Sequence, residues 1–321
     1  MAALRPRVVI PADDPPQLQG SPHLARLEAE AEVRIYDNRP STDEEKIRRV
    51  AGATCMINSR SACKWPGSVL RRCPDLRMIT VCGIGTDAID VAAAKELGIA
   101  VCNIPGKTAK IVAEHALALM FAVARNAWRC TEDLKRGLWK ARDLVFLHGK
   151  KLGVIGAGPI GAEMMRLGQA VGMEVCAWTF HPANERSKAL GVPFVPLKVL
   201  LATSDVVSIH LPLSDRSRGL LSARELSLMK RGSVLVNTGR GAIVDHLALV
   251  EMLRSEHLYG AGIDVFPTEP LPADDPILSC PNVVLTPHIA DQTPEGMDLL
   301  NGGAVDNVLS FLRGTPIHSV I

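Results

Sequence analysis

The segment KLGVIGAGPIG, residues 151–161, carries the clearest fold signal in this chain of 321 residues. It begins as a short apolar strand and then turns through glycines spaced as GxGxxG, namely Gly156, Gly158 and Gly161, before a helix from about Ile160 to Val171. Glycines at this spacing permit a tight turn, a close approach of the backbone to a pyrophosphate and close packing of helix on strand. The stretch therefore predicts a dinucleotide-binding fold with phosphates at the start of the helix. An ordinary turn between a strand and a helix is the alternative.

On both sides of this stretch, short apolar runs such as RVVI, TCMIN, EVCAW and GSVLVN alternate with helical patterns. Such alternation predicts βαβ units and parallel sheets. We expect an α/β protein of two doubly wound parallel-sheet domains. Residues 1–103 and 290–321 form the first, and residues 104–289 form an inserted Rossmann domain. A long helix from about Thr108 to Trp128 leads into the inserted domain, and a last helix from about Pro294 to Arg313 returns to the first.

The composition argues against several classes of partner. Thirty-six Lys and Arg against 34 Asp and Glu leave a formal charge of +2, and no stretch concentrates one sign. We therefore expect neither a nucleic-acid nor a membrane partner. The first residues contain no apolar core of a signal peptide, and the most apolar helical segment is interrupted by Glu114, His115 and Arg125. These features predict a cytoplasmic protein.

The eight cysteines form no CxxC pair, and several lie in apolar runs such as TVC and EVCAW. We expect them to be reduced thiols of the core, where cysteine behaves as a small hydrophobic residue. Neither the cysteines nor the nine histidines cluster at the short spacing of metal ligands, so we expect no metal.

Three motifs with polar, reactive side chains follow the glycine-rich stretch. They are NTGRG with Arg240, DVFPTEP with Glu269 and LTPH with His288, and each comes just after a predicted parallel strand. Ligands of doubly wound sheets bind beyond the carboxyl ends of the strands, so we expect these side chains to face the same crevice as a nicotinamide.

These residue types match the reduction of a 2-oxo acid. His288 would protonate the carbonyl oxygen as hydride arrives, Glu269 would orient the imidazole and raise its pKa, and Arg240 would bind the substrate through a forked contact. Each residue alone also has a structural explanation. A Glu between prolines is usually solvated, an Arg after Gly often caps a turn, and a His after Pro can satisfy a backbone group.

The chain resembles the D-isomer-specific 2-hydroxyacid dehydrogenases, the family of phosphoglycerate, glycerate and glyoxylate/hydroxypyruvate reductases. The motifs that carry the resemblance are VCGIGTDAIDVAAAKELGIAVCNIPG, VIGAGPIG, NTGRGAIVD, AGIDVFPTEPLP and VVLTPHIADQT. The resemblance implies a flavodoxin-like substrate domain, a homodimer, and a small 2-oxo or 2-hydroxy acid as substrate. Backbone amides near Ile84 and Gly85, together with Arg240, would hold the substrate, and Arg240, Glu269 and His288 would be catalytic.

The resemblance also implies a set of residues that contact NAD or NADP. These are Gly156, Gly158, Pro159, Ile160, Gly161, Thr179, Thr238, Gly239, Arg240, Asp264, His288, Ala290 and Asp291.

Thr179 bears on the choice between the two cofactors. It stands at the end of EVCAWT, where NAD-dependent members carry an aspartate that would repel a 2′-phosphate. A threonine with a neutral hydroxyl here predicts that the protein accepts NADPH, with a mild preference for NADP over NAD. NADP-using relatives commonly place an Arg directly after this position, whereas this chain has Phe180 and His181, with Arg186 and Lys188 farther along. The alternative is that Thr179 simply ends a strand and that both cofactors bind.

A function without catalysis stays open, because the resemblance extends to transcriptional co-repressors that keep this fold and its Arg, Glu and His as NAD(H) sensors. The lack of a long charged appendage disfavours that role. Arg60 after a predicted strand could reach the far end of a substrate or be a solvated surface residue, and Trp139 could line the pocket or pack a helix. Asp291 stands where the family often has a small residue, so the loop beside His288 could carry an unusual charge.

Overall fold

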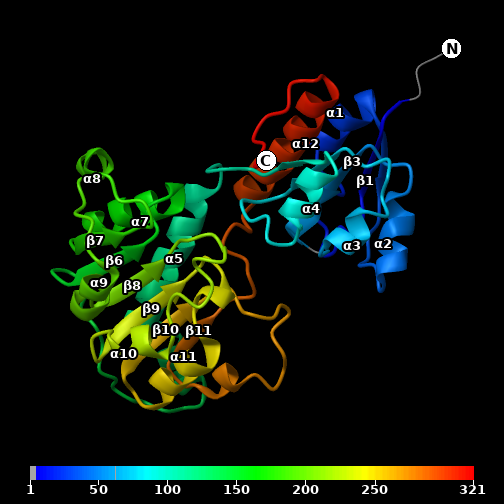
Figure 1. The fold of residues 1–321 in the computed structure, drawn as a ribbon. Helices are drawn as coiled ribbons and strands as arrows, with labels where there is room; N and C mark the ends of the chain where they lie inside the picture. The colour runs from blue at the N-terminus through cyan, green and yellow to red at the C-terminus, as the bar shows by residue number, and fades with distance from the viewer. Residues whose placement is uncertain (1–4, 62) are drawn as a thin grey trace. The chain divides into compact units, whose positions relative to one another are not determined.

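The computed structural model describes residues 5–61 and 63–321. These form two compact units, unit 1 from residues up to 108 and from 292 onward, and unit 2 from 109 to 291 (Figure 1). The chain leaves unit 1 after residue 108 rather than after 103. The reason is that Ile104 is fully buried in the core of unit 1 and Thr108 is also buried.

Unit 1 is built on a five-stranded parallel sheet in the order β2-β1-β3-β4-β5. Its strands are β1 (Arg7–Ile10), β2 (Glu32–Ile35), β3 (Cys55–Asn58), β4 (Met78–Val81) and β5 (Ala100–Cys102). This order is the flavodoxin-like one, so the expected fold of the first domain is confirmed.

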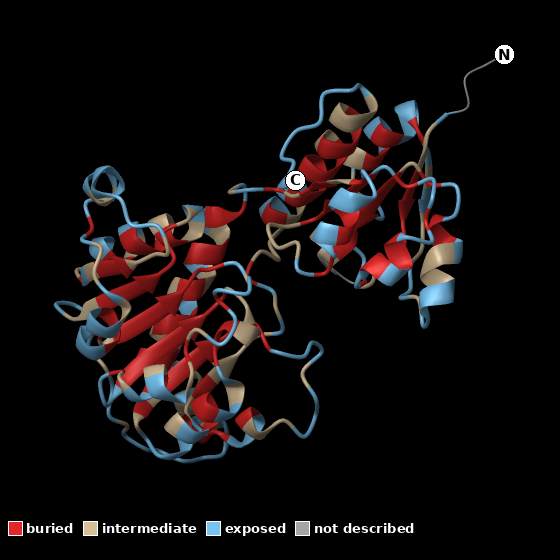
Figure 2. Ribbon diagram, in the orientation of Figure 1, coloured by how far each residue is buried: buried red, intermediate tan, exposed pale blue. Residues whose placement is uncertain are grey.

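Helices cover both faces of the unit 1 sheet. They are α1 (His23–Glu30), α2 (Asp43–Val50), α3 (Gly67–Leu70), α4 (Val91–Glu96) and α12 (Pro294–Leu312), with a 3-10 turn η1 (Ser59–Ser61) after β3. Side chains of α1 and α12 pack with one set of strand residues, including Ile10 and Ile57. Side chains of α2, α3 and α4 pack with the alternate set, including Val9 and Met56. The inner strands β1, β3 and β4 are therefore buried on both faces, as Figure 2 shows, which explains their apolar runs. The edge strand β2 is partly exposed along its length.

Unit 2 is built on a six-stranded parallel sheet in the order β11-β10-β9-β8-β6-β7. Its strands are β6 (Lys151–Ile155), β7 (Glu174–Trp178), β8 (Val206–Ile209), β9 (Ser233–Asn237), β10 (Leu258–Ile263) and β11 (Val283–Leu285). Beyond β7, a single parallel bridge joins Ala177 to Phe194 where a Rossmann sheet carries its third strand. The inserted Rossmann domain is therefore confirmed.

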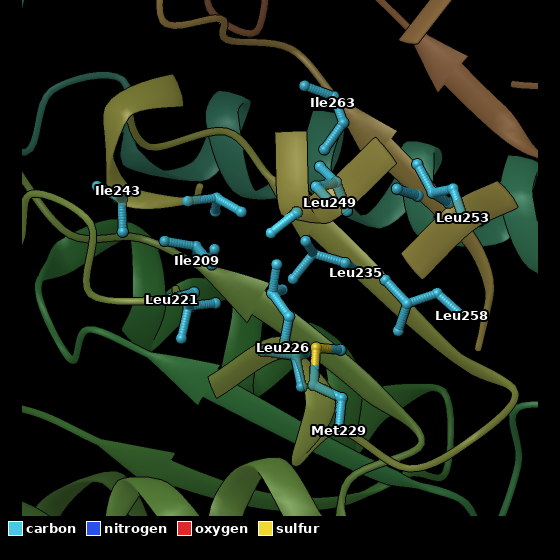
Figure 3. Packing of buried hydrophobic residues seen from close by; sticks show 14 of the residues in the cluster. Ile209, Leu221, Leu226, Met229, Leu235, Ile243, Leu249, Leu253, Leu258 and Ile263 are labelled. Carbon is cyan, nitrogen blue, oxygen red and sulfur yellow. The ribbon is translucent and has the colours of Figure 1, made fainter. Parts of the chain in front are cut away.

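The unit 2 sheet also has a helical layer on each face. Its helices are α5 (Ala109–Ala124), α6 (Ala127–Lys135), α7 (Pro159–Ala170), α8 (Asn184–Leu190), α9 (Leu197–Thr203), α10 (Ala223–Ser227) and α11 (His246–Arg254), with 3-10 turns η2 (Gly241–Ile243) and η3 (Pro276–Ser279). Helices α5 and α7 pack on one face. Helices α9, α10 and α11 pack on the other, where Leu226, Leu235 and Leu249 belong to one buried cluster (Figure 3).

The helix expected from Thr108 to Trp128 is interrupted. Helix α5 ends at Ala124 and α6 begins at Ala127, because Asn126 between them has a left-handed backbone (φ 47°). Asparagine reaches this conformation more easily than most residues, and here its side-chain amide donates to the Tyr259 hydroxyl. The apolar pattern continues through the break with Ala127 and Trp128, which is why the pattern predicted one helix.

In the part of the chain that the structure describes, no helix is both long and apolar enough to cross a membrane. No disulfide links the cysteines, and seven of the eight are buried, as expected for core thiols. Burial raises the pKa of the Cys55 thiol to about 12 and that of Cys102 to about 11, which makes both inert.

Candidate active site

Three neighbouring strands of unit 2 position the three candidate catalytic residues. In the sheet, β9, β10 and β11 lie side by side and run parallel. Arg240 follows β9, Glu269 follows β10 and His288 follows β11. Since the carboxyl ends of parallel strands meet at one edge of the sheet, the three loops converge there.

His288 and Glu269 form a hydrogen-bonded pair. The imidazole Nδ1 of His288 donates to Oε2 of Glu269 across 2.7 Å, while the backbone N–H of Phe266 donates to Oε1 of the same carboxylate across 2.9 Å. The carboxylate is thus held from two sides, and it fixes the tautomer of the ring. The His288 side chain is 44% exposed, so its Nε2 is left for a ligand.

The pKa shifts of the two residues favour a protonated His288 and an ionised Glu269. Burial lowers the pKa of His288, but the hydrogen bond and the negative charge of Glu269 raise it more, and the net pKa lies above the ordinary value. Burial raises the pKa of Glu269, but the hydrogen bond and charge of His288 lower it more, so the net pKa lies below the ordinary value. An imidazolium beside a carboxylate is therefore the favoured state.

Arg240 lies close enough for its charge to reach both partners, since it lowers the pKa of His288 and of Glu269. The turn that carries it is clamped by Asn237, the last residue of β9. The Asn237 side chain accepts from the Gly239 N–H at 3.0 Å and donates to the Arg240 carbonyl at 3.1 Å. One guanidinium nitrogen, Nη1, also donates to the Gly239 carbonyl at 2.8 Å.

Asp264 organises the backbone around His288. Its fully buried carboxylate accepts from the Thr286 hydroxyl (2.6 Å), from the Ile289 N–H (2.9 Å) and from the Ala290 N–H (3.1 Å). His288 itself has a positive φ of 54°, which costs roughly 1 kcal/mol or more in a residue with a side chain. The bonds from Asp264 on both sides of His288 hold that conformation. The contact of Asp264 with the nucleotide stays a prediction.

His115 of α5 completes this network, and the sequence reasoning did not identify it. Its Nε2 donates to the Thr286 hydroxyl at 3.0 Å and lies 3.5 Å from the Asp264 carboxylate. Burial raises the pKa of Asp264, but hydrogen bonds from His115, Thr286 and Ile289 lower it more, so the carboxylate stays ionised. The sequence signal that could have marked His115 is its position as one of three polar residues, with Lys110 and Glu114, in a mostly apolar helix.

The glycine-rich loop fits a dinucleotide. Gly156 has a φ of +103°, and a Cβ there would lie 2.5 Å from the His210 carbonyl oxygen, while a Cβ on Gly161 would lie 1.9 Å from the Gly156 carbonyl oxygen. Side chains are therefore excluded inside the turn. A Cβ on Gly158 would meet nothing within 4 Å, so the outer side of the loop is open at the start of α7, where backbone N–H groups favour a pyrophosphate.

His210, whose backbone lies beside the glycine-rich loop, is excluded as an acid or base. His210 follows β8 and is buried, and burial lowers the pKa of its imidazole to about 3. Its Nε2 bonds to the Ser208 hydroxyl at 2.8 Å, and its Nδ1 lies 3.4 Å from the Thr238 hydroxyl. His210 is thus a neutral residue that links the β8 and β9 loops.

The other predicted contact residues lie in both units. Within unit 2, Thr179 follows β7, while Pro159 and Ile160 begin α7. In unit 1, Ile84 and Gly85 follow β4, with the Ile84 carbonyl accepting from Asn103 at 2.8 Å, and Arg60 follows β3 with a φ of 48°. Because β3 and β4 are neighbours, these two loops share the carboxyl edge of the unit 1 sheet. Their part in substrate binding stays a prediction.

Comparison with known proteins decides the family. The family model described as the D-isomer specific 2-hydroxyacid dehydrogenase, NAD binding domain, matches residues 117–290. The chain belongs to the D-isomer specific 2-hydroxyacid dehydrogenase family. It is therefore an oxidoreductase that uses a nicotinamide cofactor, and the resemblance seen in its motifs is confirmed.

Individual relatives align along most of this chain. A glyoxylate reductase of Korarchaeum cryptofilum is 34% identical over 97% of this chain and 94% of its own. A hydroxypyruvate reductase of Thermotoga maritima is 40% identical over 84% of this chain and 89% of its own. Among solved structures, an acyclic imino acid reductase in complex with NADPH and D-Arg superposes with a TM-score of 0.89 at 26% identity, covering 98% of this chain and all of that one.

Proposed function

We propose that this dehydrogenase reduces a small 2-oxo acid, such as glyoxylate or hydroxypyruvate, to the D-2-hydroxy acid, with His288 as the acid. The observation that carries the proposal is the 2.7 Å bond between His288 and Glu269, formed beside Arg240 at the ends of three neighbouring strands. The two reductases that align along most of the chain support the choice of substrate class.

The nucleotide would be held by the glycine-rich loop and the start of α7, with Thr238 and Gly239 near its nicotinamide half and Ala290 and Asp291 closing the site. When bound, the reduced nicotinamide supplies the hydride. The residues of the chain bind and orient the substrate and move the proton.

Arg240 binds the substrate carboxylate through its fork of N–H groups and polarises the carbonyl. The Nε2–H of His288 donates its proton to the carbonyl oxygen, and the neutral ring that results keeps its Nδ1–H on Glu269. In the oxidative direction, the same neutral Nε2 accepts the hydroxyl proton.

The enzyme uses NADPH at least as readily as NADH, because Thr179 brings no carboxylate to the end of β7. A 2′-phosphate would meet no like charge from this side chain. The imino acid reductase solved with NADPH supports the compatibility of this fold with the phosphorylated cofactor.

The proposal is tested by following absorbance at 340 nm with NADPH or NADH and a panel of 2-oxo acids from glyoxylate to phenylpyruvate. We expect turnover with glyoxylate or hydroxypyruvate. A protein that binds the nucleotides but oxidises neither in the presence of any 2-oxo acid would instead act as a nucleotide sensor of the co-repressor kind.

Glu269→Gln is expected to lower turnover by about one order of magnitude near neutral pH and to move the pH profile to lower pH. Reduction needs protonated His288, so its rate falls as the pH rises through the pKa of His288. Glutamine removes the negative charge that raises this pKa, and burial and Arg240 then lower it. The measurement is kcat/KM for reduction between pH 5 and pH 10.

The matched control for this pH profile is Glu225→Gln. It changes another carboxylate that is hydrogen-bonded to a neighbouring side chain, in helix α10. Its profile should coincide with that of the wild type. If Glu269→Gln left the falling limb of the profile in place, Glu269 would not set the pKa of the acid.

The protein forms a homodimer through residues 134–146 of unit 2. Five large apolar side chains on this short segment are solvent-exposed in the single chain: Leu134, Leu138, Trp139, Leu144 and Phe146. Trp139 is 93% exposed and Phe146 is 70% exposed. A cluster of this kind is typical of an interface, and large aromatic residues dominate binding energies there.

Trp139→Glu combined with Phe146→Glu is expected to weaken the dimer by at least about a hundredfold, because two aromatic anchors are replaced by charges that would have to be buried. Sedimentation equilibrium measures the change. Leu247→Glu in α11 is the control, since Leu247 is also 70% exposed. A wild-type monomer at micromolar concentration, or a double variant that still dimerises as the wild type does, would refute the interface.

A further inference from the structure

The last residue of β7, Trp178, and Phe180 just beyond it form an aromatic platform at the edge of the nucleotide domain. The ring of Phe180 meets that of Trp178 edge to face, with centroids 4.8 Å apart. Both side chains pack against the buried cluster of unit 2 that includes Ile155 and Ile209. The Phe180 ring, next in sequence to Thr179, is therefore held in place by Trp178 and by the buried cluster.

An arginine from a different loop lies on this platform. The guanidinium carbon of Arg216 is 4.4 Å from the centroid of the Phe180 ring, and its Nη1 is 3.4 Å from Nε2 of His181. Arg216 belongs to the loop after β8, which is separated from β7 in the sheet by β6. Stacking of a guanidinium on an aromatic face is favourable and leaves the N–H groups at its edge available to a ligand.

The loop that carries Arg216 is held by its own hydrogen bonds. The Ser217 hydroxyl, which is fully buried, donates to the Pro212 carbonyl at 2.7 Å and accepts from the Ser214 N–H at 2.8 Å. The Ser214 hydroxyl in turn accepts from the Ser217 N–H at 3.3 Å. This internal bonding positions Arg216 over β7 before any ligand arrives, which reduces the entropy lost on binding.

A second guanidinium lies at the glycine-rich loop. Arg186 of α8 donates through Nη2 to the carbonyl of Ala157, the residue between Gly156 and Gly158. Three exposed basic side chains therefore lie around the end of β7: His181, Arg186 and Arg216. Thr179 stands where NAD-dependent members of the family carry an aspartate. The carboxylates nearest in sequence are Glu185 and Asp215, both exposed.

This arrangement matches one part of a nucleotide. In dinucleotide folds, the residue at the end of the second strand faces the 2′ position of the adenosine ribose. A phosphate there carries a charge of about −1.5 to −2 at neutral pH and three acceptor oxygens, which a guanidinium fork matches in geometry. NAD(H) has a hydroxyl at the same position and gains little from a cation.

We infer that Arg216, stacked on Phe180 beside His181, binds the 2′-phosphate of NADP(H), so that a residue from the β8 loop takes the role of an arginine directly after Thr179. The inference rests on the proposed use of NADPH and adds the side chain responsible for it. Arg216 is a binding residue and takes no part in the proton transfer at His288.

The test measures equilibrium binding by isothermal titration calorimetry, with NADP⁺, NAD⁺ and 2′,5′-ADP as probes and no substrate present. In Arg216→Gln, we expect NADP⁺ and 2′,5′-ADP to bind about tenfold or more weakly and NAD⁺ to bind within about twofold of the wild type, since one charged hydrogen-bond partner is lost. Arg218→Gln is the matched control, because it removes the same charge from an exposed position of the same loop and should leave all three affinities unchanged.

Other results would overturn the inference. An equal loss for NAD⁺ and NADP⁺ in Arg216→Gln would make Arg216 a contact to the shared part of the nucleotide, and an equal loss in Arg218→Gln would reduce the effect to net charge. Tight binding of NADP⁺ that Arg216→Gln leaves unchanged would also refute it, while the proposed function would stand. If neither nucleotide bound to the wild type, both the inference and the proposed function would fail. Thermal unfolding of each variant verifies that it is folded.

Discussion

His288→Ala is expected to lower turnover by about two to four orders of magnitude and to leave nucleotide binding intact. Without the imidazole, the site has no side chain in the place of His288 to deliver a proton to the developing alkoxide. The proton must then come from water. The glycine-rich loop and α7 lie on another part of the sheet, after β6, so most of the predicted nucleotide contacts are kept and the affinity should change little although His288 is one of those contacts. The readouts are kcat with a saturating 2-oxo acid and the dissociation constant of the reduced cofactor.

A second histidine offers a control for the loss of an imidazole. His246, at the start of α11, bonds through Nε2 to the Asp275 carboxylate at 2.8 Å and so also forms a histidine–carboxylate pair. His246→Ala should retain most of the wild-type turnover. If His288→Ala retained near wild-type turnover under conditions where chemistry limits the rate, His288 would not be the acid.

The parts of the site that could be predicted from the sequence depend on local pattern and strand order. Gly156 and Gly161 are required by backbone geometry within one turn, so their spacing is visible in the sequence. Arg240, Glu269 and His288 each follow a strand, and parallel strands place such residues at one edge whatever the side-chain details. The residue types also predicted that Glu269 would orient the His288 ring, and the structure places a hydrogen bond of 2.7 Å between them.

What the sequence could not supply are contacts between residues far apart in the chain. His115 reaches Thr286 from a helix 171 residues earlier, and nothing in its own segment indicates this partner. Arg216 lies over Phe180 only because β7 and β8 flank β6 in the sheet. The break at Asn126 was missed for another reason, since the apolar pattern of a helix is insensitive to one left-handed residue.

Arg240→Lys is expected to lower kcat/KM for a 2-oxo acid by about a hundredfold, through a higher KM and a lower kcat together. Lysine keeps the positive charge but offers a single ammonium in place of a planar fork, and each hydrogen bond to a charged group contributes roughly 1.5–3 kcal/mol. In addition, the bond from Nη1 to the Gly239 carbonyl, which helps to orient the guanidinium, is lost. Steady-state kinetics over a range of substrate concentrations separates the two effects.

The control for Arg240→Lys is Arg231→Lys, at the exposed turn before β9 and therefore at the opposite end of the same strand. It makes the same chemical change away from the site and should leave both constants unaltered. Because Asn237 holds the backbone of the Arg240 turn independently of the Arg240 side chain, the lysine variant keeps the turn and tests the guanidinium alone. Unchanged constants in Arg240→Lys would mean that a positive charge at this position is enough, and that the forked contact with the substrate carboxylate does not exist.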